Sequence, residues 1–295
     1  MRTDENPVMN PEMVAQIEKM CIDDDERAIR LGGEFVARGG LIYPMAKERH
    51  PWFIPPFELP AGKGTLIVSI DTHISTPHGV LWIWVDWDGV IEEFPLIEDK
   101  PNLYSVSELF KNGSIPQLAE YIEQTEGVLG RKHDMAFSDP SGWNTDQTRP
   151  NEKTIAEQLS DAGVYAEKGS KDLRGGILKV RELLTIPDGA DHPRLMTFTT
   201  CNRLRFERRN YRTPDLRGRA KDERAPSEKP LDKDDHIMEC ERRICEAVMD
   251  GKVQVIEMEV EPEHSFAEMM YGGKKIDVNF EEESEYGVID SVIGE

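Results

Sequence analysis

The sequence predicts a mixed α/β fold in which an antiparallel meander is extended by parallel strands and flanked by helices. Two observations support this prediction. Runs of β-forming residues follow one another closely between residues 65 and 97, which is typical of a meander. From residue 107 onward, short apolar runs alternate with helical patterns, and this alternation requires parallel strands joined by crossover helices.

The first strand, residues 65–71, is the run around which we expect the sheet to be organised. It carries no charged residue before Asp71. A continuous apolar run of this kind is typical of a strand buried on both faces. A carboxylate at the end of a buried strand is costly unless it has a partner. Asp71 is therefore a candidate metal ligand, and a hydrogen-bonded turn is the simpler explanation.

Two further strands complete the predicted meander. Residues 79–87 are rich in aromatic and β-branched side chains. Asp88-Gly89 is a strong signal for a two-residue hairpin turn. The third strand is expected over residues 90–97, where Pro95 favours a sheet edge or the end of a strand.

The remaining elements are predicted from helical spacing, capping residues and short apolar runs. Ser107 is expected to cap a helix that begins near Glu108. The other expected helices cover 10–40, 115–125, 154–162, 172–184, 202–211 and a stretch from Asp234-Asp235 to about residue 249; the expected strands cover 135–140, 164–166, 194–199 and 253–260.

We expect three parts along the chain: a helical and extended connector over 1–60, an α/β domain over 61–250, and a C-terminal strand with an acidic tail over 251–295. Residues 43–60 combine prolines with aromatic side chains, so they cannot form a helix and should pack on the domain that follows. The acidic tail is typical of a solvated extension, with a partner-binding tail as the alternative.

Composition excludes several classes of protein. The chain has 295 residues, 38% of them hydrophobic, and a formal net charge of −21. This charge argues against a general nucleic-acid coat and against binding to an anionic membrane surface. No apolar run approaches the roughly 18 residues of a membrane span, and the N-terminus has no signal-peptide core. The four cysteines lack CxxC spacing, which is typical of reduced thiols in the cytoplasm.

The segment from residue 202 to residue 224 reverses the acidic balance of the chain. Such a stretch is either an exposed loop that balances nearby acids or a loop that contacts nucleic-acid phosphates, because arginine makes bidentate bonds to phosphate oxygens. The candidate DNA-binding residues are Arg203, Arg205, Arg209, Arg212, Arg217, Arg219 and Lys221.

A second group of acids lies at the start of the last predicted helix. Asp234 and Asp235 are first of all candidates for capping that helix. Asp235 and Glu239 are four residues apart and share one helical face. The acids at this helix start are therefore also candidates to project toward the sheet.

These features occur in an order that resembles a known family. The strand ending in Asp71 is followed by a strand ending in Asp139-Pro140-Ser141, and later by Lys233-Asp234-Asp235-His236 opening a helix. Further matches are His73 after the first strand, the strands at 82–87 and around Glu93, residues 197–201 ahead of Glu207 and Tyr211, and the connector runs 30–34 and 39–43. Over roughly residues 1–250 the set resembles the ribonuclease H-like nuclease domain of the large terminase subunits of tailed bacteriophages.

The resemblance implies a metal-dependent endonuclease that cuts double-stranded DNA with little sequence preference during viral genome packaging. It implies that Asp71, Asp139 and Asp235 are catalytic, that Asp71 bridges two Mg²⁺ or Mn²⁺ ions, that Asp139 holds one ion, and that Asp234 with Asp235 completes the other. Two such ions, roughly 3.5–4 Å apart, can activate a water molecule and stabilise the leaving oxygen. His73, His236 and Glu239 are expected to support these ligands from neighbouring positions.

Two departures from the family pattern stand out. The sequence has no G-x-x-x-x-G-K-[ST] motif, so the ATPase of large terminases is missing from it. Glu239 stands where the family usually has an aspartate. The expected partners are double-stranded DNA, a terminase ATPase, the small terminase subunit and the portal, in the host cytoplasm and away from any membrane. Whether the chain is an excised domain or works with an ATPase in trans stays open.

Two alternatives are compatible with the same sequence features. One is a resolvase-like nuclease of the same fold that recognises branched DNA. The other is a non-catalytic docking module for the packaging motor or portal, in which the acids are only caps and turns.

Overall fold

The computed structural model describes residues 10, 12–14, 40–73, 76–144, 153–213, 230 and 234–253. Two compact units divide the chain, Met1–Met258 and Glu259–Glu295, and every described residue belongs to the first. Apart from a helical turn at 12–14, the helices expected within 10–40 lie outside the described residues or at their margin. The strand expected at 253–260 and the acidic tail also lie outside them, save for Val253.

In the described part of the chain, seven strands form one sheet in the order β1-β7-β4-β3-β2-β5-β6. Strand β3 runs antiparallel to both of its neighbours, β2 and β4, whereas the other neighbouring pairs are parallel. The predicted mixed sheet is therefore confirmed. The strands are β1 (Phe53–Ile54), β2 (Thr65–Asp71), β3 (His78–Asp86), β4 (Asn102–Lys111), β5 (Met135–Ser138), β6 (Glu167–Lys168) and β7 (Leu195–Phe198).

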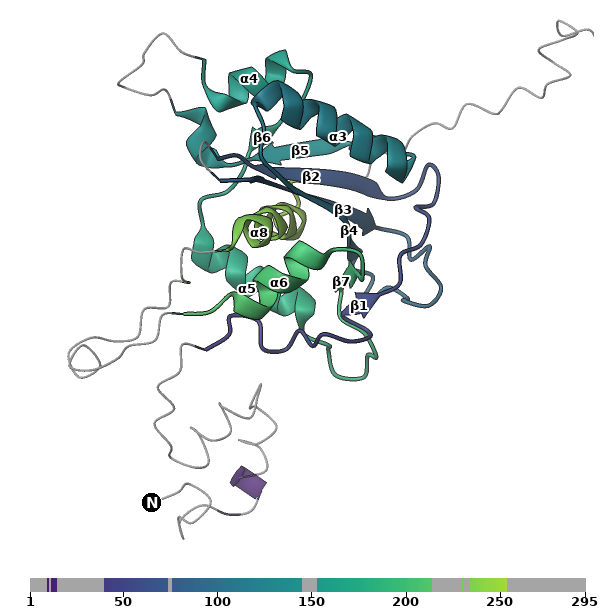
Figure 1. Cartoon of the computed structure of the whole chain (residues 1–295). Coiled ribbons are helices and arrows are strands. Elements are labelled where there is room, and N and C mark those ends of the chain that lie inside the picture. Colours follow the sequence, from purple (N-terminus) through teal and green to yellow (C-terminus); the bar gives the residue numbers. More distant parts are fainter. Residues whose placement is uncertain are drawn as a thin grey trace, which may run out of the picture. The chain divides into compact units, whose positions relative to one another are not determined.

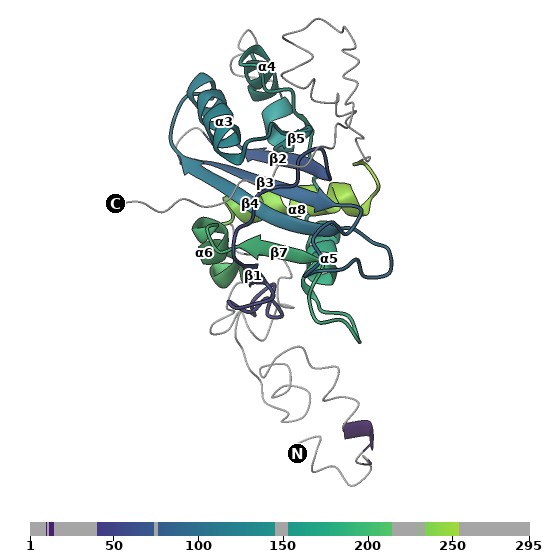
Figure 2. The same ribbon diagram turned by 90° about the vertical axis from the view of Figure 1, so that its right-hand side faces the viewer.

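Helices cover both faces of this sheet, as Figures 1 and 2 show. Helices α3 and α4 lie on one face, and α8, with α5 and α6 beside it, lies on the other. The described helices are α3 (Ile115–Leu129), the 3₁₀ helix η2 (Pro140–Trp143), α4 (Ile155–Asp161), α5 (Leu173–Leu184), α6 (Asn202–Asn210) and α8 (His236–Met249). Among the described residues, no helix is both long and apolar enough to cross a membrane.

The core lies on both sides of β2, which is buried along its whole length as the sequence predicts. Its register with β3 brings Val68 opposite Trp82 and Leu66 opposite Trp84. On the face covered by α8, that helix is itself largely buried, including its charged residues Glu241, Arg242, Arg243 and Glu246. Because buried charges must be paired, α8 fixes a network of ion pairs against the centre of the sheet.

The extended segment before β2 packs on the sheet rather than acting as a free linker. Strand β1 pairs with β7 in parallel, and the Trp52 indole donates a hydrogen bond of 2.8 Å to the Leu184 carbonyl oxygen. The Phe57 ring lies edge-on to the rings of Tyr104 and Phe198, with centroids 5.3 and 4.8 Å away. The aromatic side chains of this segment therefore form part of the core.

The prediction of a strand at 90–97 is wrong. The Asp86 carboxylate accepts hydrogen bonds from the backbone amides of Asp88, Val90 and Ile91, at 3.2, 3.1 and 3.3 Å. These bonds hold the chain after β3 in a compact turn, a use of aspartate that competes with strand formation. The third strand of the meander is instead β4, and it follows a long loop rather than a two-residue hairpin.

The helix predicted to begin near Glu108 is also wrong, because Ser107 and Glu108 lie within β4. The Glu108 carboxylate accepts hydrogen bonds from the backbone amides of Arg203 and Leu204, at 2.5 and 2.7 Å. This acid therefore satisfies the first turn of α6, a helix far along the chain, rather than starting a helix of its own. The strand expected at 164–166 is displaced as well, since β6 covers Glu167–Lys168.

Candidate active site

The two strand-end acids meet at one edge of the sheet. Asp71 is the last residue of β2, and Asp139 directly follows β5. These strands are parallel neighbours with Ile70 opposite Ser138, and the Asp139 amide donates a hydrogen bond of 3.0 Å to the Ile70 carbonyl oxygen. Parallel pairing in this register places both carboxylates at the carboxyl ends of their strands, where α/β sheets bind ligands.

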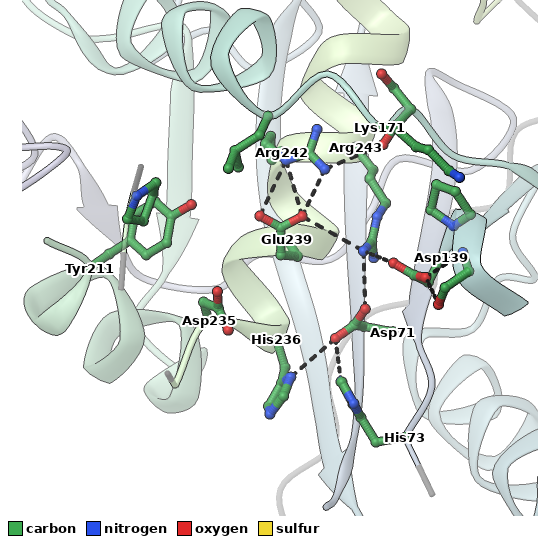
Figure 3. A pocket seen from close by; sticks show the side chains of 15 residues that line it. Asp71, His73, Asp139, Lys171, Tyr211, Asp235, His236, Glu239, Arg242 and Arg243 are labelled. Atoms are coloured by element: carbon green, nitrogen blue, oxygen red, sulfur yellow. Dashed lines mark hydrogen bonds and ion pairs between the residues drawn. The ribbon is translucent and has the colours of Figure 1, made fainter. Parts of the chain in front are cut away.

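The N-terminus of α8 crosses the same edge. A Cβ atom on Gly79 of β3 would lie 3.0 Å from the Cβ of His236 and 3.2 Å from its carbonyl carbon. Glycine at this position therefore permits the close approach of helix and strand. The stripe His236, Glu239 and Arg243 follows helical spacing and faces the two acids (Figure 3).

The Asp71 carboxylate is buried and fully engaged. Its Oδ2 lies 2.6 Å from His73 Nε2 and 3.1 Å from His236 Nδ1, and its Oδ1 lies 3.1 Å from an Arg243 nitrogen. Burial favours the protonated acid, but the hydrogen bonds from His236 and His73, with the charge of Arg243, lower the pKa of Asp71 well below its usual range. Hydrogen bonding to Asp71 in turn raises the pKa of His236.

Arg243 joins the two acids. One terminal guanidinium nitrogen contacts both Asp71 and Asp139, and it lies 3.7 Å from Glu239 Oε2. The side chain is only 3% exposed. Burial opposes its charge, but the neighbouring Asp71 and Asp139 carboxylates raise the pKa of Arg243, so it remains a cation. In this structure a protein cation lies where two carboxylates would otherwise repel each other.

These side chains border a cavity of about 380 Å³. Its lining includes Asp71, Asp139, Asp235 and Glu239 together with His73, His236, Arg242, Arg243, Lys171 and Tyr211. The structure therefore brings three predicted catalytic residues, Asp71, Asp139 and Asp235, to one cavity. Asp139 also accepts hydrogen bonds from the amide and hydroxyl of Ser141, so it caps the 3₁₀ helix η2 as well as facing the cavity.

The adjacent acids Asp234 and Asp235 have different surroundings. Asp235 is the N-cap residue of α8 and lines the cavity. Asp234 has a positive φ of 53° and directs its carboxylate to Arg203, at 3.0 Å. Glu239 shares the cavity with Asp235, as their four-residue spacing predicts, and forms ion pairs with Arg242 at 2.7 Å and with Arg243.

The described arginines of the basic segment already have protein partners. Arg203 stacks on the Phe110 ring, with its guanidinium carbon 4.0 Å from the ring centroid, and pairs with Glu207 at 2.7 Å. Arg205 and Arg209 both pair with Glu48. A guanidinium nitrogen of Arg212 lies 3.4 Å from the Arg209 carbonyl oxygen. The other predicted DNA-binding residues lie outside the described residues: Arg217, Arg219 and Lys221.

One group of side chains among the described residues could hold a metal ion. One ligand atom each from Asp71, His73 and His236 lies within 4.8 Å of the other two. The His73 and His236 rings are 4.0 Å apart between centroids, and the backbone amide of His73 donates to His78 Nδ1 at 3.1 Å. A carboxylate with two imidazoles is a donor set that suits first-row transition ions.

Arg243 and Glu207 are among the residues at the site that were not predicted as site residues from the sequence. Arg243 bridges the acids, and Glu207 accepts hydrogen bonds from the backbone amides at the start of α8. A signal for Arg243 is present in the sequence, because Arg242 and Arg243 lie within a predicted helix between the apolar residues Ile237 and Ile244. Charges on a buried helical face predict buried acidic partners.

Comparison with solved structures identifies similar folds. The nuclease domain of the P22 large terminase is 17% identical, with a TM-score of 0.52, and the match covers 73% of this chain and 95% of that domain. The large terminase of a thermophilic bacteriophage is 17% identical, with a TM-score of 0.50, and the match covers 84% of this chain and 55% of that one. The complex of the same thermophilic-phage terminase with ADP is 18% identical, with a TM-score of 0.52, covering 83% and 54%.

This chain thus spans about half the length of the thermophilic-phage large terminase that it matches. No protein-family model matches the sequence, and no curated protein does. The mixed sheet, the helices on both of its faces and the similarity to solved structures agree with one another. The described chain therefore has the ribonuclease H-like fold of the nuclease domain of phage large terminases.

Proposed function

We propose that this chain is a metal-dependent endonuclease that cleaves double-stranded DNA with little sequence preference during viral genome packaging. The observation that supports this most is the convergence of Asp71, Asp139 and Asp235 on one cavity at the carboxyl end of the central strands. Carboxylates grouped in this way suit Mg²⁺ and Mn²⁺, which prefer oxygen ligands. When bound, such ions supply the charge that activates water and stabilises a leaving oxygen.

The residues of the site suit this role. Asp71 remains a carboxylate although it is buried, because its pKa is lowered by hydrogen bonds from His236 and His73 that outweigh burial. Asp71 and Asp139 would hold the ions. Asp235, together with its neighbour Asp234, would complete the set of ligands. Before an ion binds, His73 and His236 hold the Asp71 carboxylate through hydrogen bonds, and Glu239 pairs with Arg242 and Arg243.

The substrate follows from the way in which such a site recognises DNA. A site that reads phosphates rather than base edges cuts with little sequence preference. Arg203, Arg205, Arg209 and Arg212, with Arg217, Arg219 and Lys221 beyond the described residues, are proposed to contact the backbone. The net charge of −21 opposes this approach, so the isolated chain should bind DNA weakly. A terminase ATPase, the small terminase subunit and the portal are the proposed partners in the host cytoplasm.

The test is cleavage of supercoiled plasmid by the full chain in EDTA, Mg²⁺ or Mn²⁺. We expect nicking and linearisation with a divalent ion, and loss of at least about a hundredfold in rate in Asp71→Asn and Asp139→Asn. Asp191→Asn, at an exposed acid outside the cavity lining, is the matched control and should cut as the wild type does.

Two other outcomes would change the proposal. Preference for a four-way junction over linear duplex would favour the resolvase-like alternative. The docking alternative is supported by two structural roles of the acids: Asp139 caps η2, and Asp234 pairs with Arg203. Absence of cleavage with every ion, together with a melting temperature unchanged by metal, would favour it.

A further inference from the structure

We propose that the two cation positions around Asp71 are unequal. A first-row transition ion binds on Asp71, His73 and His236. Arg243 occupies the position between Asp71 and Asp139, so a second ion enters only when the guanidinium leaves. This inference rests on the proposed function for its purpose, but its test needs no DNA.

The two oxygens of Asp71 face different partners. Oδ2 is directed to His73 Nε2 and His236 Nδ1, at 2.6 and 3.1 Å, and Oδ1 is directed to Arg243 at 3.1 Å (Figure 3). The same guanidinium nitrogen contacts Asp139. The carboxylate therefore has one face with nitrogen donors and one face already closed by a protein cation.

The face with the nitrogen donors borders the cavity. His73 and His236 are 32% and 19% exposed, and both line the cavity, so an ion in the cavity can reach them. Two imidazoles and one carboxylate suit cobalt, zinc and similar ions better than Mg²⁺, which prefers oxygen ligands and retains its waters. This half of the site should therefore discriminate against Mg²⁺.

The other face is built around the arginine. A Cβ atom on Gly169 would lie 2.9 Å from Arg243 Cδ, so the glycine leaves the space that the side chain fills. Among the described residues, Arg243 Nε and Nη1 have no hydrogen-bond partner. The buried guanidinium is therefore held chiefly by the carboxylates of Asp71 and Asp139, with Glu239 nearby.

A second ion would have to replace this guanidinium. Arg243 already places a positive charge between the two carboxylates, which is the role that an ion between them would have. Its displacement would separate a buried cation from its partners, and that separation is costly. The affinity for a second ion should therefore be much lower than the affinity for the first.

The experiment is metal titration of the full chain without DNA. Co²⁺ is followed by its visible absorption, which reports nitrogen ligands, and Mn²⁺ by calorimetry and by the electron paramagnetic resonance of the free ion.

The wild type should bind one ion tightly and a second weakly. Arg243→Met should bind the second ion at least about tenfold more tightly. His73→Gln and His236→Gln should weaken the first ion at least about tenfold and change the Co²⁺ spectrum.

Arg194→Met is the matched control. Arg194 is also buried, but it lies outside the cavity lining and donates a hydrogen bond to the Pro101 carbonyl oxygen rather than to the strand-end acids. The variant should bind metal as the wild type does. Arg243→Lys keeps a cation that cannot bridge both acids equally, so its second-ion affinity should lie between those of wild type and Arg243→Met. Circular dichroism verifies that each variant is folded. If Arg243→Met does not fold, the second-ion affinity of Arg243→Lys tests the inference instead.

Three results would overturn the inference: two equal ions in the wild type, an unchanged second-ion affinity in the folded Arg243 variants, or a Co²⁺ spectrum that the histidine variants do not alter. Failure of the proposed function has a different signature. A chain that loads metal unequally but does not cut plasmid contradicts the nuclease alone, and a chain that cuts plasmid but loads two equal ions contradicts only the inference.

Discussion

The buried carboxylate of Glu207 on α6 accepts a hydrogen bond of 2.7 Å from the backbone amide of Ile237 in the first turn of α8. It also accepts one of 3.0 Å from the amide of Met238. The first amides of a helix have no partner within the helix, and a negative charge there is favoured by the helix dipole. Glu207 therefore caps α8 from another helix and fixes the end that carries His236.

Removal of this cap should destabilise the domain. Glu207→Ala leaves buried amides without partners, so we expect a loss of about 1–3 kcal/mol in the free energy of unfolding. Urea denaturation measures it. Glu123→Ala, at an exposed position of α3, should change stability by less than about 0.5 kcal/mol. Equal losses in the two variants would contradict the capping role.

The pairing of Asp71 predicts a defined response to acid. Its pKa in the folded chain lies below the ordinary value of 3.8, because the hydrogen bonds from His236 and His73 outweigh burial. The unfolded chain therefore takes up the proton first as the pH falls. The stability that the paired Asp71 contributes is complete above the ordinary pKa and is lost as the pH falls below it toward the folded-state value.

Urea midpoints between pH 7 and pH 3, measured in EDTA, test this response. Asp71→Asn has no titrating carboxyl at this position, so its midpoint should fall less steeply with acid than that of the wild type. Parallel curves for the two proteins would show that Asp71 does not contribute to the acid response.

The ion pair between Arg208 and Glu241 is buried between α6 and α8, with side-chain exposures of 4% and 0%. Among the described residues, Arg208 Nε and Nη1 and Glu241 Oε2 lack hydrogen-bond partners, so the pair only partly compensates its burial. Arg208→Met alone should cost about 3–5 kcal/mol, because Glu241 then remains as an unpaired buried acid. The double variant Arg208→Met with Glu241→Leu should recover most of this loss. A double-mutant cycle in urea measures the coupling between the two side chains. Additive losses in the free energy of unfolding would show that the two side chains are not coupled.

The contact of Glu48 with Arg205 and Arg209 predicts how DNA affinity can be changed. If these arginines contact phosphates, Glu48 competes with DNA for them. Glu48→Gln should then strengthen binding to duplex DNA, and Arg205→Gln with Arg209→Gln should weaken it across all sequences and reduce the salt slope by about 1 for each arginine. Fluorescence anisotropy at several salt concentrations measures both. Lys153→Gln, at an exposed lysine paired with Asp161, is the control and should leave the slope unchanged.

The parts of the fold that could be predicted are those in which local pattern and tertiary burial agree. The apolar run of β2 and the capped helix α5 are examples, and both were predicted within one residue of their bounds. Strand β4 was missed because its sequence, NLYSVSELFK, mixes apolar residues with serines and a glutamate whose partners lie in α6. No window of local sequence contains those partners.

The same distinction applies to the site. Asp71, Asp139 and Asp235 stand at element boundaries, where an acid is conspicuous in the sequence. The different surroundings of Asp234 and Asp235 were not predictable, because the positive φ of Asp234 and its contact with Arg203 depend on the assembled fold. The partnership of Arg243 with the strand-end acids required the register of β2 with β5 and the position of α8, which only the assembled fold defines.

The order of the elements has a consequence for synthesis of the protein. Asp71 and Asp139 emerge from the ribosome early, on adjacent strands, whereas His236, Glu239 and Arg243 all belong to α8, the last described helix. A nascent chain that ends before α8 holds two neighbouring carboxylates without their cation or their histidines. Completion of the site is thus coupled to translation of α8, the last helix of the described residues.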